Sequence, residues 1–185
     1  MDALHPLLIA DVAKKIATAA AHMHELGWIH RRIRLDHILV DGNIGTIGEV
    51  WLSGLSKAKQ VAMGDELLKD NPKKSTVLSY GAARDVRDLG KVMTAMIMLY
   101  GNMPAGSSFK QDMIKFRAHK PALAEYMRSS AGKPFHRLLN IARKMVDGDA
   151  SMPGHTRPSM NRVVEMLDEM LDPLCSTGPP LRQQN

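Results

Sequence analysis

The chain has 185 residues, of which 44% are apolar and 24% charged, and its formal net charge is +6. This length and composition predict one globular domain with a sizeable core and argue against disorder except at the ends. No run approaches the ~18 consecutive apolar residues of a membrane helix, and the N-terminus lacks a secretory signal pattern. The single cysteine, Cys175, excludes an internal disulfide. We therefore expect a soluble cytoplasmic protein, with the nucleus as the alternative.

The positive net charge favours acidic partners. Aromatic residues make up only 4% of the chain, and no stripe of Arg and Lys alternates with aromatic side chains that could stack on bases. Specific nucleic-acid binding is therefore not the favoured interpretation of the charge.

Residues 6 to 26 predict an amphipathic helix that ends at Gly27, because apolar side chains recur at helical spacing. The helical period is lost from Trp28 to Leu55. Two short β-like runs there, Ile38 to Val40 and Glu49 to Leu52, are separated by glycines and an Asp-Gly-Asn turn. They predict a small β-hairpin on a helical body.

Residues 56 to 84 are polar and have no clear period, so we expect irregular structure there. Residues 85 to 100 carry apolar side chains nearly all round a helix and predict a buried one. Three more helices are expected, with prolines in the first turns of the last two: 107–129, Pro134–Val146 and Pro158–Leu171. The domain would span residues 1–172, followed by a disordered tail over residues 173–185.

Three segments in a row, a helix ending "HMHELGWIH", a loop "RRIRLDH" and a run "ILVDGN", resemble helix E, the catalytic loop and strand 7 of eukaryotic-type protein kinases. Farther on, "NPKKSTVLSYGAARDVRDLG" resembles the segment that leads into helix F, and "TRPSM" supplies the family's late arginine. The resemblance covers roughly residues 5 to 172. It implies a mainly α, protein-kinase-like C-lobe: a helical bundle with a small β-hairpin at the catalytic-loop region. Since no glycine-rich loop or strand-3 lysine precedes the first helix, we expect the N-lobe to be absent.

The resemblance implies that the catalytic loop is degenerate. His30 and Arg31 match the family pattern, whereas Arg32 stands at the position of the catalytic Asp, Arg34 at that of a Lys and His37 at that of an Asn. Phosphoryl transfer in this family uses the Asp to accept the proton of the attacking hydroxyl. Arginine stays protonated and has no acceptor lone pair, so Arg32 cannot replace it.

The metal-binding Asp-Phe-Gly of the family matches Leu52, Ser53 and Gly54. Magnesium requires hard oxygen ligands, which Leu52 lacks, and the imidazole of His37 is a poor substitute for an amide oxygen. His30 and His37 flank one loop, but the resemblance makes the first a packed core residue rather than a zinc ligand. We therefore expect no metal, no cofactor and no enzymatic activity.

Two further positions receive structural roles from the resemblance. Asp85 matches the Asp that opens helix F and accepts backbone hydrogen bonds from the His-Arg turn, here from His30 and Arg31. Arg157 matches the arginine that pairs with the Glu of an Ala-Pro-Glu motif. Lys73 occupies that Glu position, so like charges would meet.

The absent lobe would normally cover the hairpin. Without that cover, Ile38, Val40, Trp51 and Leu52 are expected to form an apolar patch at or near the surface. We expect this patch to bind a partner protein or a second copy of the chain, with Trp51 as the anchor. The alternative is that Trp28, the first helix or the segment from Ser56 to Asp70 folds over the patch and covers it.

Three hypotheses for function follow. The first is a catalytically inactive, kinase-like protein-binding module: a decoy, scaffold or competitor of an active kinase. The second is one part of a split or longer ATP-dependent Ser/Thr protein kinase. The third is a basic anion- or nucleic-acid-binding domain that uses Arg31, Arg32 and Arg34.

Overall fold

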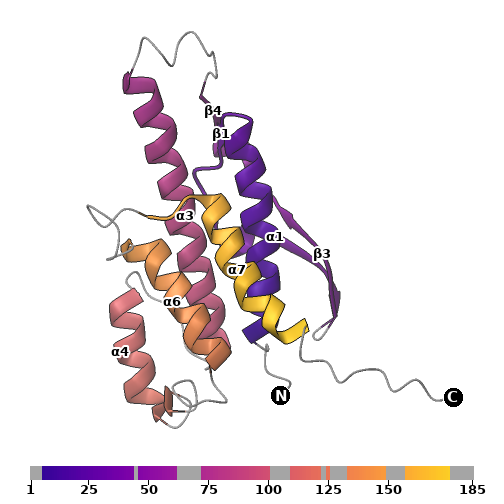
Figure 1. The fold of residues 1–185 in the computed structure, drawn as a ribbon, viewed down its shortest axis with the longest axis vertical. Helices are drawn as coiled ribbons and strands as arrows, with labels where there is room; N and C mark the ends of the chain where they lie inside the picture. The colour runs from indigo at the N-terminus through magenta and orange to yellow at the C-terminus, as the bar shows by residue number, and fades with distance from the viewer. Residues whose placement is uncertain are drawn as a thin grey trace, which may run out of the picture.

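The computed structural model describes residues 6–43, 46–61, 72–100, 109–121, 124–125, 133–148 and 157–175. These residues are mainly helical (Figure 1), which confirms that the chain is mainly α. The helices are α1 Pro6–Glu25, α3 Pro72–Tyr100, α4 Phe109–His119, α6 Lys133–Asp147 and α7 Met160–Cys175. In the described part of the chain, no helix combines the length and the apolar character that crossing a membrane demands.

The predicted hairpin is present and is longer than expected. Strand β2 (Ile38–Asn43) pairs antiparallel with β3 (Thr46–Leu52), and Leu39 lies opposite Trp51. A second, smaller ribbon pairs β1 (Trp28–Ile29) with β4 (Lys59–Gln60). Strands of two residues are too short to show an alternating pattern, so this ribbon was not predicted.

Helix α1 begins and ends at residues suited to those places. Pro6 lacks the N–H group that would be unpaired in a first turn. At the other end, Gly27 adopts a left-handed φ of 74° and donates its N–H to the carbonyl of His24. The predicted helix is confirmed, although its last helical residue is Glu25, one residue before the predicted end, and Gly27 terminates it as expected.

Small side chains on α1 allow its neighbours to come close. Four alanines on one face of α1 are wholly buried: Ala10, Ala13, Ala17 and Ala20. This helix lies beside α3 and α7 and also contacts β3 of the hairpin (Figure 1). The Lys15 ammonium donates to the carbonyl of Gly48 at 2.8 Å and ties the exposed side of α1 to the same strand.

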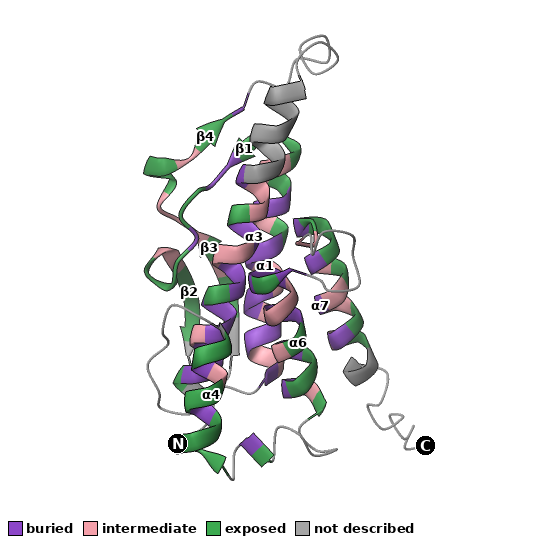
Figure 2. Cartoon of the chain, turned by 90° about the vertical axis from the view of Figure 1, so that its left-hand side faces the viewer, coloured by how far each residue is buried: buried purple, intermediate pink, exposed green. Residues whose placement is uncertain are grey.

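The core lies between α1, α3, α6 and α7, where the buried residues gather (Figure 2). Helix α3 supplies a large share of it: Val86, Leu89, Val92, Met93, Met96 and Ile97 are buried as the apolar pattern predicts, and Met98 is buried as well. Leu99, which belongs to the same predicted pattern, is 53% exposed. Two charged or titratable side chains, Asp85 and His30, are also fully buried. Buried polar groups need hydrogen-bond partners, so these two residues mark the point where the core meets the candidate site.

The prediction for residues 56–84 was wrong in its second half, because α3 already begins at Pro72. Asp85 therefore lies well inside this helix and does not open it. Residues 72–84 contain two Lys, two Ala, one Leu and one Arg, which favour helix, and Gly81 made the stretch look interrupted. A Cβ at Gly81 would come within 2.5 Å of Ile29 Cδ1, so the glycine allows α3 to pass β1 closely.

The later helices follow the predictions with shifted ends. Pro134 lies in the first turn of α6, as expected, but α7 begins after Pro158 because Ser159 caps it, with its Oγ accepting the Arg162 N–H at 3.2 Å. Of the predicted 107–129 helix, 109–119 form α4, and 121, 124 and 125 are helical. Helix α7 continues to Cys175, past the expected start of the tail at residue 173, and residues 176–185 lie outside the described residues.

Candidate functional site

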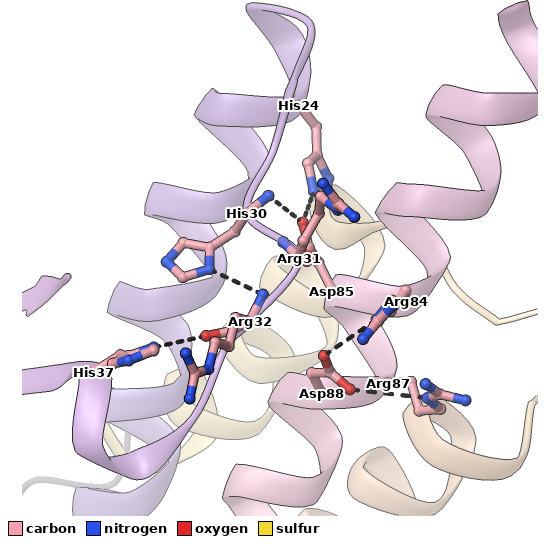
Figure 3. A network of polar contacts seen from close by, with 9 residues as sticks. All are labelled: His24, His30, Arg31, Arg32, His37, Arg84, Asp85, Arg87 and Asp88. Carbon is pink, nitrogen blue, oxygen red and sulfur yellow. Dashed lines mark hydrogen bonds and ion pairs between the residues drawn. The ribbon is translucent and has the colours of Figure 1, made fainter. Parts of the chain in front are cut away.

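The carboxylate of Asp85 fastens the turn after β1 to helix α3 (Figure 3). Its Oδ2 accepts the N–H of His30, and its Oδ1 accepts the N–H of Arg31, both at 2.7 Å. These are the two hydrogen bonds that the resemblance predicts. A third partner, which was not predicted, is His24 Nε2 at 3.0 Å from Oδ2. Hydrogen bonds to an ionised group are short and strong, and three of them satisfy a carboxylate that has no contact with solvent.

The turn itself has an unusual backbone at Arg31. Its φ is 68°, and it is the only described non-glycine residue with a positive φ. The left-handed region costs an L-residue roughly 1–2 kcal/mol. The hydrogen bonds from His30 and Arg31 to Asp85 offset that cost and hold the turn in this shape.

The two histidines of the loop hold the loop to the end of the hairpin. His30 Nδ1 lies 3.3 Å from the N–H of Arg32 and accepts it, so its Nε2 carries the proton and donates to the Ser53 carbonyl at 2.9 Å. His37 Nδ1 donates to the Arg32 carbonyl at 2.8 Å. Ser53 completes the connection, because its N–H and its Oγ both donate to the His37 carbonyl, at 2.8 and 3.0 Å.

Gly54 is required by the same arrangement. Its φ is 81°, and a Cβ built on it would lie 2.5 Å from the His37 ring. Leu52 pairs with Ile38 across the hairpin and packs partly buried against the core. The Leu52, Ser53 and Gly54 positions thus serve packing and backbone hydrogen bonding.

A groove of about 860 Å³ lies beside this turn. Its lining includes six cationic side chains, from Arg31, Arg32, Arg34, Lys57, Arg84 and Lys91. Two carboxylates, Asp36 and Asp88, and the apolar residues Ile33, Leu35, Val92 and Ala95 complete it. We call this surface the basic groove.

Both carboxylates of the basic groove have arginine neighbours. Asp36 Oδ1 lies 3.0 Å from Arg34 Nε. Asp88 lies 3.9 Å from Arg84 and 3.8 Å from Arg87. Burial raises the pKa of Asp88 above its ordinary value, and the nearby Arg87, Arg84 and Lys91 only partly counteract this effect.

Arg157 closes the C-terminal end of α6. Its Nε donates to the carbonyls of Met145 and Val146, and its Nη2 donates to Val146 at 2.8 Å. A cation at the last carbonyls of a helix also interacts favourably with the helix dipole. The expected opposition of Arg157 and Lys73 involves a side chain outside the described residues.

The predicted apolar patch on the hairpin exists only in part. Val40 and Trp51 are 45% and 49% exposed, but Ile38 and Leu52 are partly buried against the core. Successive strand residues point to opposite faces, so Ile38 and Leu52, which pair with each other, share the inner face. The partner of Trp51 on the outer face is Leu39, which is 54% exposed and was not predicted. We call Leu39 and Trp51 the exposed hairpin pair.

Sequence reasoning also missed His24, Lys57, Arg84, Asp88 and Lys91. Arg84, Asp88 and Lys91 are spaced four and three residues apart, which places them on one helix face. The shared face can be recognised only when residue 84 is known to belong to the same helix as residues 88 and 91. Lys57 joins them from the turn after Gly54, and only the folded arrangement brings it there. Across the described ranges, no three His, Cys, Asp or Glu residues are grouped to hold a metal ion.

Comparisons with known proteins give partial similarities. No protein-family model matches the chain. STE20-related kinase adapter protein alpha of Mus musculus is 29% identical over 121 residues, which is 56% of this chain and 27% of that protein. The Gallus gallus and Homo sapiens proteins of the same name are 28% and 27% identical. The chain thus matches less than a third of the length of these relatives, and the similarity supports a kinase-like fold.

Among solved structures, the crystal structure of the Rad53 kinase domain and SCD2 is similar. The match has 17% identity and a TM-score of 0.46, and it covers 90% of this chain and 67% of that one.

Proposed function

We propose that the chain is a catalytically inactive, kinase-like module that acts by binding another protein. The observation that carries the proposal is the position of Arg32, a cation in the lining of the basic groove. By the resemblance, this is the position of the proton-accepting carboxylate of a kinase. A protonated guanidinium cannot accept that proton, and it adds positive charge where a base is needed.

The other altered positions support the same proposal. Leu52, at the position of the metal-binding Asp, is an apolar side chain packed partly against the core. His37 uses Nδ1 to bond the Arg32 carbonyl. Asp85, a carboxylate close to the turn, already accepts three hydrogen bonds. His37 and Asp85 stabilise the turn through these hydrogen bonds. A role for either residue in proton transfer or magnesium binding would disrupt the contacts that hold the turn.

A binding role is supported by the relatives and by the hairpin. The relatives are named as kinase adapters, and we extend that role to this chain as a scaffold, decoy or competitor of an active kinase. The exposed hairpin pair, Leu39 and Trp51, offers adjacent large apolar side chains on one face of a two-stranded sheet. Large aromatic side chains dominate the energetics of many protein interfaces.

Affinity capture from the cells that produce the chain tests the proposal. The parent chain should retain a protein kinase, and Leu39→Lys with Trp51→Lys should retain clearly less of it. Ile114→Lys is the matched control, because Ile114 on α4 is 57% exposed and lies on another element. Equal capture by the parent and the hairpin variant would exclude the hairpin as the contact. Absence of any stoichiometric protein partner would contradict the proposed function.

A further inference from the structure

We propose that the basic groove binds an acidic polypeptide segment of the partner, an inference that rests on the proposed function. The cations of the groove come from three separate parts of the chain. Arg31, Arg32 and Arg34 lie on the loop after β1, Lys57 lies on the 3-10 turn Leu55–Lys57, and Arg84 and Lys91 lie on α3. The fold therefore concentrates charge that the sequence distributes over more than fifty residues.

The positive charge of the groove exceeds what its own carboxylates can balance. Asp36 is paired with Arg34, and Asp88 lies near Arg84 and Arg87. The ion pairs between described residues involve none of the other four lining cations: Arg31, Arg32, Lys57 and Lys91. Like charges held together in one concave surface repel each other, and an anionic ligand relieves that repulsion.

The chemistry of the lining fits carboxylates displayed on a polypeptide. Guanidinium groups bind carboxylates through two parallel hydrogen bonds, and Arg31 and Arg32 are both available for this. The exposed side chain of Leu35 and the half-buried Ala95 give the groove an apolar component that can contact aliphatic stems. Asp36 and Asp88 supply acceptors for peptide N–H groups. The volume of about 860 Å³ leaves room for a short extended segment.

The same lining argues against a nucleic acid. None of the residues that line the groove is aromatic, and single-stranded nucleic acids are bound largely by stacking on aromatic side chains. Asp36 and Asp88 would also repel a continuous phosphodiester chain, whereas a polypeptide can present its acidic side chains to the arginines and its backbone to these carboxylates.

Fluorescence anisotropy with the full chain tests the inference. The probe is a fluorescein-labelled peptide of alternating Glu and Gly residues, and the control peptide has Gln in place of Glu. The acidic peptide should bind in a salt-dependent manner, and the Gln peptide should not. Arg32→Gln with Lys91→Gln should weaken binding about tenfold, because two charged contacts are lost. Lys57→Gln with Arg84→Gln is a second pair with the same expected effect.

The matched control removes the same charge elsewhere. Lys110→Gln with Arg117→Gln changes two exposed cations of α4 and should alter the affinity less than about twofold. All the substituted side chains are exposed, so thermal unfolding of each variant should match that of the parent. Four results would overturn the inference: no binding of the acidic peptide, equal loss in the groove and α4 variants, equal binding of the Gln peptide, or tighter binding of an oligothymidine than of the acidic peptide. If the acidic peptide does not bind but the partner is still captured, the inference about the groove is wrong and the proposed function stands. If the peptide binds but no protein is captured, the proposed function is wrong.

Discussion

At the scale of single residues, Asp85 stabilises the turn through its hydrogen bonds to the N–H groups of His30 and Arg31. Its replacement by Ala leaves the N–H groups of His30 and Arg31 without their acceptor in a buried place. We expect Asp85→Ala to lower the free energy of unfolding by about 3 kcal/mol, since hydrogen bonds to charged groups are worth roughly 1.5–3 kcal/mol and orphaned donors add to the loss. Urea unfolding followed by circular dichroism measures this change.

Asp168→Ala is the control for this measurement. Asp168 forms an ion pair with Lys14 on the surface, and both side chains are more than a third exposed. Its loss should cost less than about 1 kcal/mol. Equal effects of the two substitutions would mean that the turn does not depend on Asp85.

Asp88 should make stability depend on pH in a way that its Asn variant does not. Because burial raises its pKa above the ordinary value of 3.8, the folded state binds this proton more tightly than the unfolded state. Ionised Asp88 therefore disfavours folding at neutral pH, and the penalty fades as the pH falls through the raised pKa and is gone below 3.8. The charged groups facing it, Arg84, Arg87, Lys91 and Asp85, are present in both proteins.

The comparison of the parent with Asp88→Asn isolates this effect. The variant should be more stable than the parent at neutral pH, and the difference should vanish in acid. Chemical unfolding at a series of pH values provides the measurement. A difference that is constant with pH, or that favours the parent at neutral pH, would show that the ion pairs with Arg84 and Arg87 outweigh burial.

At the scale of elements, α3 and α6 are in close contact at Gly90. A Cβ at this position would lie 2.8 Å from Met145 Cβ, 2.9 Å from Val146 Cγ2 and 3.2 Å from the Ala142 carbonyl. Alanine gains about 1 kcal/mol in helix propensity over glycine, but overpacking a core costs about 1–3 kcal/mol. Since the crowding atoms include a carbonyl and a Cβ that cannot rotate away, we expect Gly90→Ala to be destabilising by about 1–2 kcal/mol in thermal or urea unfolding.

Gly81→Ala is the companion variant for Gly90→Ala. The closest atom there is the terminal Cδ1 of Ile29, which can change rotamer. Its loss of stability should be smaller than that of Gly90→Ala. A larger loss of stability for Gly81→Ala than for Gly90→Ala would mean that α3 and α6 pack less tightly at Gly90 than the structure shows.

The elements show what the sequence can and cannot predict. Apolar periodicity predicted α1 and the buried part of α3, because those helices bury one continuous stripe or nearly their whole surface. It failed at residues 72–84, where a polar composition conceals a helix. The expected absence of a covering lobe predicted exposed apolar residues on the hairpin but could not say which face of the hairpin the core would cover. Leu39, rather than Ile38, therefore turned out to be the neighbour of Trp51 on the outer face.

The candidate site also has a part that could be predicted from the sequence and a part that could not. The hydrogen bonds of Asp85 to the turn could be predicted because the resemblance links residues far apart in sequence. The basic groove could not be predicted as a whole, since Lys57, Arg84 and Lys91 reach Arg32 only through the packing of α3 against the loop. His24 meets Asp85 through the packing of α1 against α3.

At the scale of the whole molecule, the proposed function combines an inactive turn with two surfaces for a protein partner. The exposed hairpin pair offers apolar contact, and the basic groove offers charge. A partner that carries both an apolar patch and an acidic segment would engage both surfaces, and linked contacts raise affinity beyond either contact alone. Loss of one surface should therefore weaken capture, and loss of both should abolish it.

The central claim is that binding has replaced phosphoryl transfer at this turn. Its most direct test is transfer of radiolabelled phosphate from magnesium ATP to a generic protein acceptor, catalysed by the purified full chain. We expect incorporation no greater than in a blank without the chain, for the parent and for Asp88→Asn and Arg32→Ala alike. Magnesium-dependent incorporation clearly above the blank, lost on substitution of Asp88 or of a residue between Trp28 and Gly54, would contradict the claim and identify the chain as an enzyme.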